Sequence, residues 1–423
     1  MTYVGSRPSN KVLTTADIAD SAVTAAKIAD GTVVASEIAD GTITSAKIAS
    51  GVIPTSRPNV NPIIINGNMA VAQRATSATG KTTGDIYTVD RMKLVLDAQG
   101  TYTVAQESLT SGNAFANGFA NAWRVDCTTA DASPSASDQL AMQYTFEGQD
   151  LQVFKKGTAN AEKFTLAFWV KSNKTGTGNI QLKDKDNSNR QCTQSYTISV
   201  ANTWEHKVCV FGADTTGAFG DDNNKSLIIN WYLGSGTDSS SGTANHGTWE
   251  AQDQTKVNDG GTLNINDNTA NDWSITGIQL EVGEYSASNV PNFQHESYGD
   301  NLWRCKRYYQ GWGSVYDTGT FGISGRTISG NRFDSSTIMF IPEMRAAPTI
   351  AQGGTADIEN YVFQSDGDSI TAGSGTSFAA LNTQKGSTKF RVTSNATLSA
   401  NRNANCQSGG GDGKQHLTFD SEL

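Results

Sequence analysis

A regular spacing of aliphatic residues near the N-terminus constrains the fold of this chain more than any other sequence feature. Residues 15–54 form a ten-residue repeat that reads TADIADSAVT, AAKIADGTVV, ASEIADGTIT, SAKIASGVIP, with an aliphatic side chain at every fifth position. Five residues advance an α-helix by about 500°, so these side chains would not lie along one stripe. In a β-strand they would fall on opposite faces in turn. A backbone turn must therefore intervene, and Asp30-Gly31 and Asp40-Gly41 suit one.

The repeat is too thin to bury its own aliphatic side chains, because about forty residues of this kind form no core alone. Several identical chains wound together would bury them; three is the usual number, although symmetry would also allow two. The alternative is a flexible low-complexity linker, and the strict spacing argues against it. We therefore predict that residues 1–58 form an N-terminal anchor and a stalk that joins a homotrimer. The predicted oligomerisation residues are Ile18, Val23, Ile28, Val33, Ile38, Ile43, Ile48 and Ile53.

Composition narrows the class of the remaining residues. Only 17% of the 423 residues are charged and 42 are Gly, which suits short strands and polar turns better than a helix-rich enzyme or a coiled coil. The net charge is −9, so nothing indicates a nucleic-acid partner. No apolar run approaches the roughly 20 residues of a membrane helix, and no signal peptide begins the chain. We expect a protein that is assembled in a cytoplasm and inserts into no membrane.

Residues 59–296 contain short β-rich runs separated by turn signals, and no helical periodicity. This pattern predicts a jelly-roll β-sandwich. The order of its strands also resembles that of carbohydrate-binding jelly-roll modules. The predicted strands are 164–172, 180–184, 195–200, 206–212, 226–234 and 273–283.

Residues 297–313 change character, since Leu302, Cys305 and Tyr308 recur at helical spacing and Asp300 could cap the start. We predict a short linking helix that packs between domains; an aromatic and basic patch for nucleic acid is the alternative. Residues 314–423 return to short strands and predict a C-terminal β-sandwich head. The fold class is therefore mainly β. The strands predicted in the head are 336–344, 349–353, 361–365, 389–394 and 416–423.

Several sequence segments resemble the fibre proteins of tailed bacteriophages. Tandem DGTITSAKIA-type repeats are frequent in such fibres, and the other segments are similar to the start, the end and the C-terminal extension of a domain found in fibres of marine and cyanobacterial phages. The resemblance implies a virion protein that attaches to other virion proteins through its N-terminus. The segments are INGNMAVAQRAT (65–76), YTVDRM (87–92), TGIQLEVGEY (276–285), ESYGDNLWRCKRYYQ (296–310), MRAAPTI (344–350) and LTFDSEL (417–423).

Sugar binding would need aromatic platforms with amides and carboxylates around them. The candidates are Trp231, Tyr232, His246 and Trp249, which flank a polar loop. Packing in the core is favoured for Trp231, because INWYL is apolar on both sides. Trp249 lies in the polar loop beside His246 and is the better candidate.

The sequence contains few candidate metal ligands and no recognisable catalytic motif. Asp221 and Asp222 could hold a structural calcium, or they could belong to a solvated loop. No GxSxG, glycine-rich phosphate loop or HExxH motif occurs, and we expect no enzymatic activity and no other cofactor.

Together these features predict a homotrimeric tail fibre of a phage virion that attaches to host surface glycans. One alternative is a structural fibre or capsid decoration protein without a receptor role. The other is a glycan hydrolase tailspike, whose paired carboxylates would come together only in space.

Overall fold

The computed structural model describes Thr24, Ile28 and residues 61–312, 322–329, 331–353, 361–365, 368–371, 377–393, 402–408 and 416–423. The chain divides into two compact units, Met1–Arg57 and Pro58–Leu423. The predicted stalk residues lie outside the described residues, except Ile28, which is exposed. Within the described residues, no helix has the length and apolar character that crossing a membrane requires.

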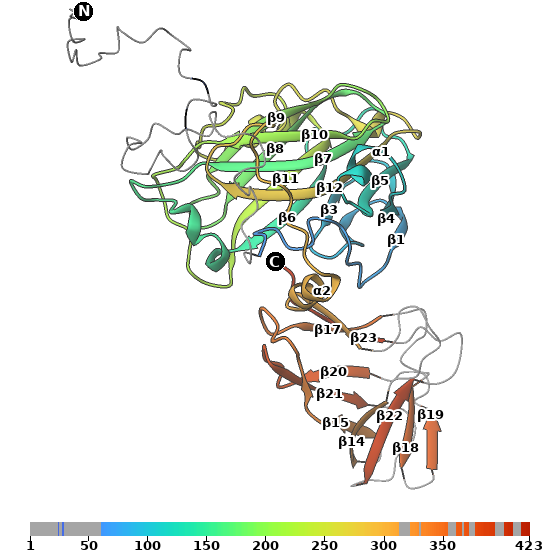
Figure 1. Cartoon of the computed structure of the whole chain (residues 1–423). Coiled ribbons are helices and arrows are strands. Elements are labelled where there is room, and N and C mark those ends of the chain that lie inside the picture. The colour runs from blue at the N-terminus through green and yellow to red at the C-terminus, as the bar shows by residue number, and fades with distance from the viewer. Residues whose placement is uncertain are drawn as a thin grey trace, which may run out of the picture. The chain divides into compact units, whose positions relative to one another are not determined.

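Two six-stranded antiparallel sheets, here called sheet A and sheet B, form a β-sandwich around one core (Figure 1). In spatial order, sheet A contains β1 (Ser77–Lys81), β4 (Thr101–Ser108), β5 (Asn121–Thr129), β12 (Asp272–Val282), β7 (Phe164–Ser172) and β10 (Glu205–Phe211). Sheet B contains β2 (Gly84–Tyr87), β3 (Lys93–Asp97), β6 (Gln139–Glu147), β11 (Lys225–Ser235), β8 (Gly176–Asp184) and β9 (Gln191–Ile198). A short helix α1 (Gly112–Ala116) precedes β5.

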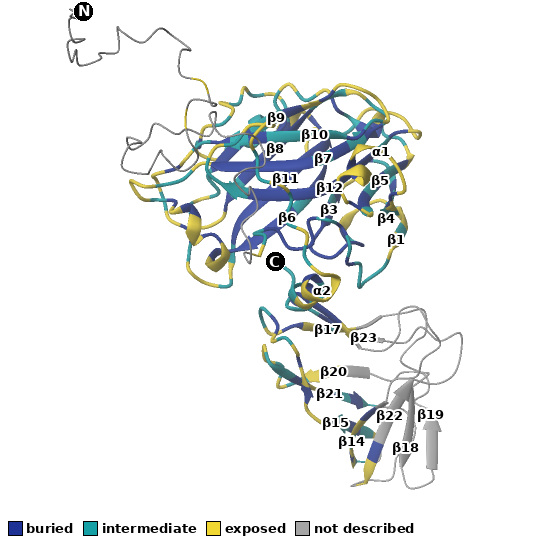
Figure 2. Ribbon diagram, in the orientation of Figure 1, coloured by how far each residue is buried: buried dark blue, intermediate teal, exposed yellow. Residues whose placement is uncertain are grey.

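Large aromatic side chains fill the space between the two sheets. Phe168 of sheet A meets Trp231 of sheet B edge to face, with ring centroids 6.0 Å apart. Trp123 and Trp273, on neighbouring strands of sheet A, are fully buried beside each other. Figure 2 shows that β7, β11 and β12 are buried along most of their length. Strand residues that face inward therefore form the core, as the alternation of a sandwich strand requires.

The predicted class, mainly β, is confirmed for the described residues. Strand β7 spans the predicted 164–172, and β11 contains the predicted 226–234. The predicted strand 336–344 is wrong for most of its length, since β16 covers only Ile338–Met339. Pro342 follows it and has no N–H to donate to a neighbouring strand.

The C-terminal part contains two further antiparallel sheets. Their core includes Phe333, Phe340, Phe390 and Phe419, all of which are buried. The smaller sheet has the order β13 (Tyr309–Trp312), β23 (His416–Asp420), β17 (Thr349–Gly353). The larger contains β14 (Gly322–Ser329), β15 (Arg332–Ser335), β16, β18 (Tyr361–Ser365), β19 (Asp368–Thr371), β20 (Ser377–Leu381), β21 (Ser387–Thr393) and β22 (Asn403–Ser408).

Helix α2 (Tyr298–Lys306) stands where the linking helix was predicted, but it is shorter. Its cap is Ser297, whose Oγ accepts the backbone N–H of Asp300 at 3.1 Å. The prediction that Asp300 caps the helix is wrong, because Asp300 lies within the first turn, where its carboxylate accepts a hydrogen bond from the Ser297 hydroxyl. Cys305 and Tyr308 are buried, in agreement with a packed helix.

The segments that carry the fibre resemblance come together beside α2. The Asn301 side-chain amide donates to Asn66 Oδ1 at 3.2 Å and to Asn68 Oδ1 at 3.0 Å. The backbone N–H of Ile278 donates to the Gly67 carbonyl at 3.0 Å. Residues 65–76, 276–285 and 296–310 are therefore held to one another by hydrogen bonds.

The end of the chain completes this arrangement through two arginines. The Arg91 guanidinium is buried, forms an ion pair with Glu422, and lies 3.5 Å from the Tyr308 ring centroid. Arg74 pairs with Asp420 at 2.9 Å. We call Arg74, Arg91, Tyr308, Asp420 and Glu422 the junction. It joins the first strands of the sandwich to the last residues of the chain.

A second buried charge lies at one end of the sandwich. The Lys156 ammonium is fully buried, donates to Asp184 Oδ2 at 2.5 Å and lies 3.1 Å from Asp214 Oδ2. It also donates to the carbonyls of Thr216 at 3.1 Å and Gly217 at 2.8 Å. Four oxygens thus surround one ammonium group, which compensates its loss of hydration.

Replacement of Lys156 by Met should lower the free energy of unfolding by about 3–5 kcal/mol, because it leaves the buried Asp184 carboxylate without a cation, while Asp214 keeps its ion pair with Arg190. Denaturant unfolding would measure this change. Lys155→Met is the matched control, since Lys155 forms an exposed ion pair with Glu162. This substitution should lower the free energy of unfolding by less than about 1 kcal/mol. Equal losses in both variants would contradict the assignment.

Asp90 makes the stability of this fold depend on pH. Its carboxylate is buried, and burial raises its pKa from 3.8 to about 6 although Arg74 opposes this shift. The folded state therefore binds the proton more tightly than the unfolded state does. The contribution of Asp90 to stability is full below about pH 4 and is lost as the pH rises through about 6.

Asp90→Asn removes this titration. The unfolding free energy of the wild type, minus that of the variant, should be about 2–3 kcal/mol higher at about pH 4 than at about pH 7. Urea unfolding of both proteins across this range would measure it. A difference that does not change with pH would show that Asp90 titrates normally.

Candidate functional site

Trp231 and Tyr232 are neighbours on β11 and so face opposite sides of sheet B. Trp231 points into the core and is fully buried, so its ring is not available to stack on a sugar. Tyr232 points outward but is covered in a small cluster with Ala141 and Val257. Its hydroxyl donates to Gln181 Oε1 at 3.3 Å, and burial raises the pKa of the Tyr232 hydroxyl.

Trp249 and His246 also have different surroundings, one in the core and the other near the surface. Trp249 belongs to the core, where its indole N–H donates to the Gly212 carbonyl at 2.8 Å and its ring lies 4.9 Å from the Lys156 ammonium. The His246 side chain is 34% exposed, and its Nε2 lies 4.0 Å from Asp259 Oδ2. The four aromatic and imidazole candidates therefore do not form one open platform.

Asp221 and Asp222, the candidate calcium ligands, lie in an exposed loop. The Asp222 carboxylate accepts hydrogen bonds from both the backbone and the side chain of Asn224, at 2.9 and 2.6 Å. Across the described ranges, no three His, Cys, Asp or Glu side chains are grouped as metal ligands. A calcium ion there would have to complete its shell with carbonyls and water.

A row of amide side chains crosses the outward face of sheet B. Gln143 Nε2 donates to Asn230 Oδ1, Asn230 Nδ2 to Gln181 Oε1, and Gln181 Nε2 to Gln191 Oε1, each at 2.9 Å. Strand register places the first three opposite one another on β6, β11 and β8. We call Gln143, Asn230, Gln181 and Gln191 the amide row. Gln143 is half-buried and is the accessible end of the row, whereas Asn230, Gln181 and Gln191 are buried behind it. The Gln181 Oε1 already accepts from both Asn230 and Tyr232, so the inner amides orient Gln143, which can meet a polar ligand.

Lysines lie beside the amide row. Lys93 on β3 pairs in register with Gln143, and its ammonium lies 3.0 Å from Asp85 Oδ2. Lys183, two residues beyond Gln181 on β8, is half-buried, and burial lowers its pKa. Lys225 at the start of β11 is also half-buried, and burial lowers its pKa, with Lys93 adding to the effect.

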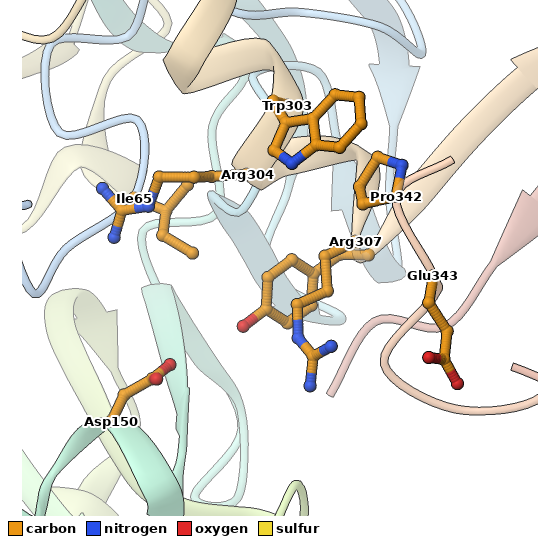
Figure 3. A pocket seen from close by; sticks show the side chains of 8 residues that line it. Ile65, Asp150, Trp303, Arg304, Arg307, Pro342 and Glu343 are labelled. Atoms are coloured by element: carbon orange, nitrogen blue, oxygen red, sulfur yellow. The ribbon is translucent and has the colours of Figure 1, made fainter. Parts of the chain in front are cut away.

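A separate cavity of about 330 Å³ opens beside α2 (Figure 3). The Trp303 indole is 52% exposed there, whereas Arg304 and Arg307 are already paired, with Glu296 and Glu147 respectively. Trp303 is not among the site residues predicted from the sequence, because the helix is predicted to pack between domains. Trp303 lies off the helical stripe of Asn301, Cys305 and Tyr308, and this spacing could have predicted its exposure. The cavity is lined by Ile65, Asp150, Trp303, Arg304, Arg307, Tyr308, Pro342 and Glu343.

Comparison with known proteins gives similarity of fold only. No family model and no curated protein matches the sequence. The enzymatically active domain of bacteriophage CBA120 tailspike protein 4 is 14% identical, with a TM-score of 0.25 over 49% of this chain and 21% of that one. The chain thus spans about a fifth of that protein. A putative sugar binding protein from Bacteroides thetaiotaomicron is 14% identical, with a TM-score of 0.28 over 52% and 100% of the two chains. A xylan-binding domain from CBM 22 is 12% identical, with a TM-score of 0.26 over 51% and 99%.

The burial of Trp249 has a testable consequence. Trp249→Ala should lower the free energy of unfolding by about 3–5 kcal/mol, because it opens the core above the Lys156 ammonium. His246→Ala should change it by less than about 0.5 kcal/mol. Denaturant unfolding of both variants would measure these effects, and an equally small change in the two would place the Trp249 ring outside the core.

Proposed function

We propose that this chain is a fibre protein of a tailed-phage virion, which binds host surface glycans without cleaving them. The sandwich of residues 59–296 would carry the binding face. The N-terminal repeat would join three chains and attach them to other virion proteins. Three copies of a weak site would act together on a surface that repeats its glycan.

The amide row supports glycan binding most directly. Amide groups can both donate to and accept from sugar hydroxyls. Gln143 is the member of the row that a sugar can reach, and its hydrogen bond to the buried Asn230, which is itself held by Gln181, fixes its orientation and reduces the entropy lost on binding. The strands of a rigid sheet also position such groups better than a loop would.

Binding without cleavage is the second part of the proposal. Three carboxylates beside this face already form ion pairs, Asp85 with Lys93, Glu147 with Arg307 and Glu250 with Lys256. A glycosidase needs one carboxylic acid and one carboxylate placed on either side of the scissile bond. The face therefore suits recognition better than hydrolysis.

Purified host polysaccharide provides the test. We expect the full chain to bind it, and expect Gln143→Ala and Asn230→Ala each to weaken binding by roughly tenfold, which is about 1.4 kcal/mol. No new reducing ends should form on prolonged incubation. Thermal unfolding of each variant would establish that the fold is kept.

Two controls locate the site. Thr197→Ala changes an exposed residue of β9 on the same sheet and should leave binding unchanged. Trp303→Ala removes the open ring of the cavity beside α2 and should also leave it unchanged. Loss of binding in Trp303→Ala alone would move the site to the cavity, and release of reducing ends would make the protein a hydrolase. No binding by the wild type would favour a purely structural fibre.

A further inference from the structure

Strand register gathers lysines at one end of the outward face of sheet B. Lys93 lies in the row of Gln143, and Lys183 lies one step further along β8, opposite Ile228. Lys225 begins β11, just before an irregularity in its pairing with β6. Lys185 is close enough to both Lys183 and Lys225 to lower their pKa values by repulsion. We call Lys93, Lys183, Lys185 and Lys225 the lysine group.

Two members of the lysine group form no ion pair within the part of the chain that the structure describes. Neither Lys183 nor Lys225 forms an ion pair or a side-chain hydrogen bond with any part of the chain that the structure describes. Both are half-buried, so each has lost some hydration without gaining a partner. A desolvated cation without a partner costs stability.

The surrounding charges do not remove this cost. Asp85 attracts Lys225 but forms its ion pair with Lys93, and Glu147, opposite Lys225 in the strand register, forms its ion pair with Arg307. Arg345, another cation near Lys225, donates to the backbone carbonyls of Asn223, Ser421 and Glu422. Residues 59–300 carry 26 acidic and 16 basic side chains, so this group of cations is a local exception in an acidic part of the chain.

We propose that the lysine group binds the anionic group of an acidic saccharide whose hydroxyls meet Gln143, the accessible end of the amide row. This proposal rests on the proposed function, because it names the class of glycan that the same face takes. The anionic group is a carboxylate, as in a uronic acid, or a sulfate ester. Either would supply the missing partner of Lys183 and Lys225 through charge-assisted hydrogen bonds.

The charge of the ligand can be changed without changing its backbone. We would compare oligogalacturonate with its neutral methyl ester, and a sulfated galactan oligosaccharide with its desulfated form, by calorimetry on the full chain. We expect one acidic form to bind roughly ten- to a hundredfold more tightly than its neutral counterpart, and this preference to shrink as salt is added. The pair that shows the preference identifies carboxylate or sulfate.

The double variant Lys183→Gln, Lys225→Gln should abolish the preference for the acidic form while the neutral form binds as before. Its thermal stability should stay the same or rise, because two desolvated cations are removed. Lys81→Gln is the matched control, since Lys81 lies on β1 of sheet A. It should leave the preference intact.

Three results would overturn the inference. In the first, neutral and acidic forms bind equally, so glycan binding stands but the anion is not recognised. In the second, the double variant keeps the full preference, so the anion is bound elsewhere. In the third, neither these oligosaccharides nor the host polysaccharide binds, and the proposed function fails with it.

Discussion

The buried ion pair between Arg91 and Glu422 is the interaction on which the rest of the structure depends. A guanidinium that is almost completely removed from water needs a carboxylate and aromatic surface around it. The carboxylate comes from the second-last residue of the chain, and the aromatic ring from Tyr308 just after α2. The sandwich therefore has a completed surface there only when α2 and the last strand are in place.

The segments that resemble phage fibres supply the residues of these contacts. Asn66, Arg91, Asn301 and Glu422 come from four separate segments, and each makes a contact with another of them. None lies in the amide row or in the lysine group. The segments that resemble phage fibres thus join the parts of the chain, while the proposed binding face lies on strands outside those segments.

The sequence was sufficient for the strands of the sandwich, because alternation and β-rich composition reflect local burial. It was not sufficient for the site, because the site depends on strand register. Trp231 and Tyr232 are adjacent in sequence, yet one lies in the core and the other under a loop. Gln143, Asn230 and Gln181 are far apart in sequence and become neighbours only through pairing of three strands. Lys156 gave no sequence signal either, since its carboxylate partners lie 28 and 58 residues further along the chain.

The most direct measurement is a crystal structure of the chain with an acidic oligosaccharide from the host surface. We expect a sugar ring to lie over Gln143 and its anionic group to lie within hydrogen-bonding distance of the Lys183 or Lys225 ammonium. A sugar bound only in the cavity at Trp303, or only in the C-terminal sheets, would contradict it.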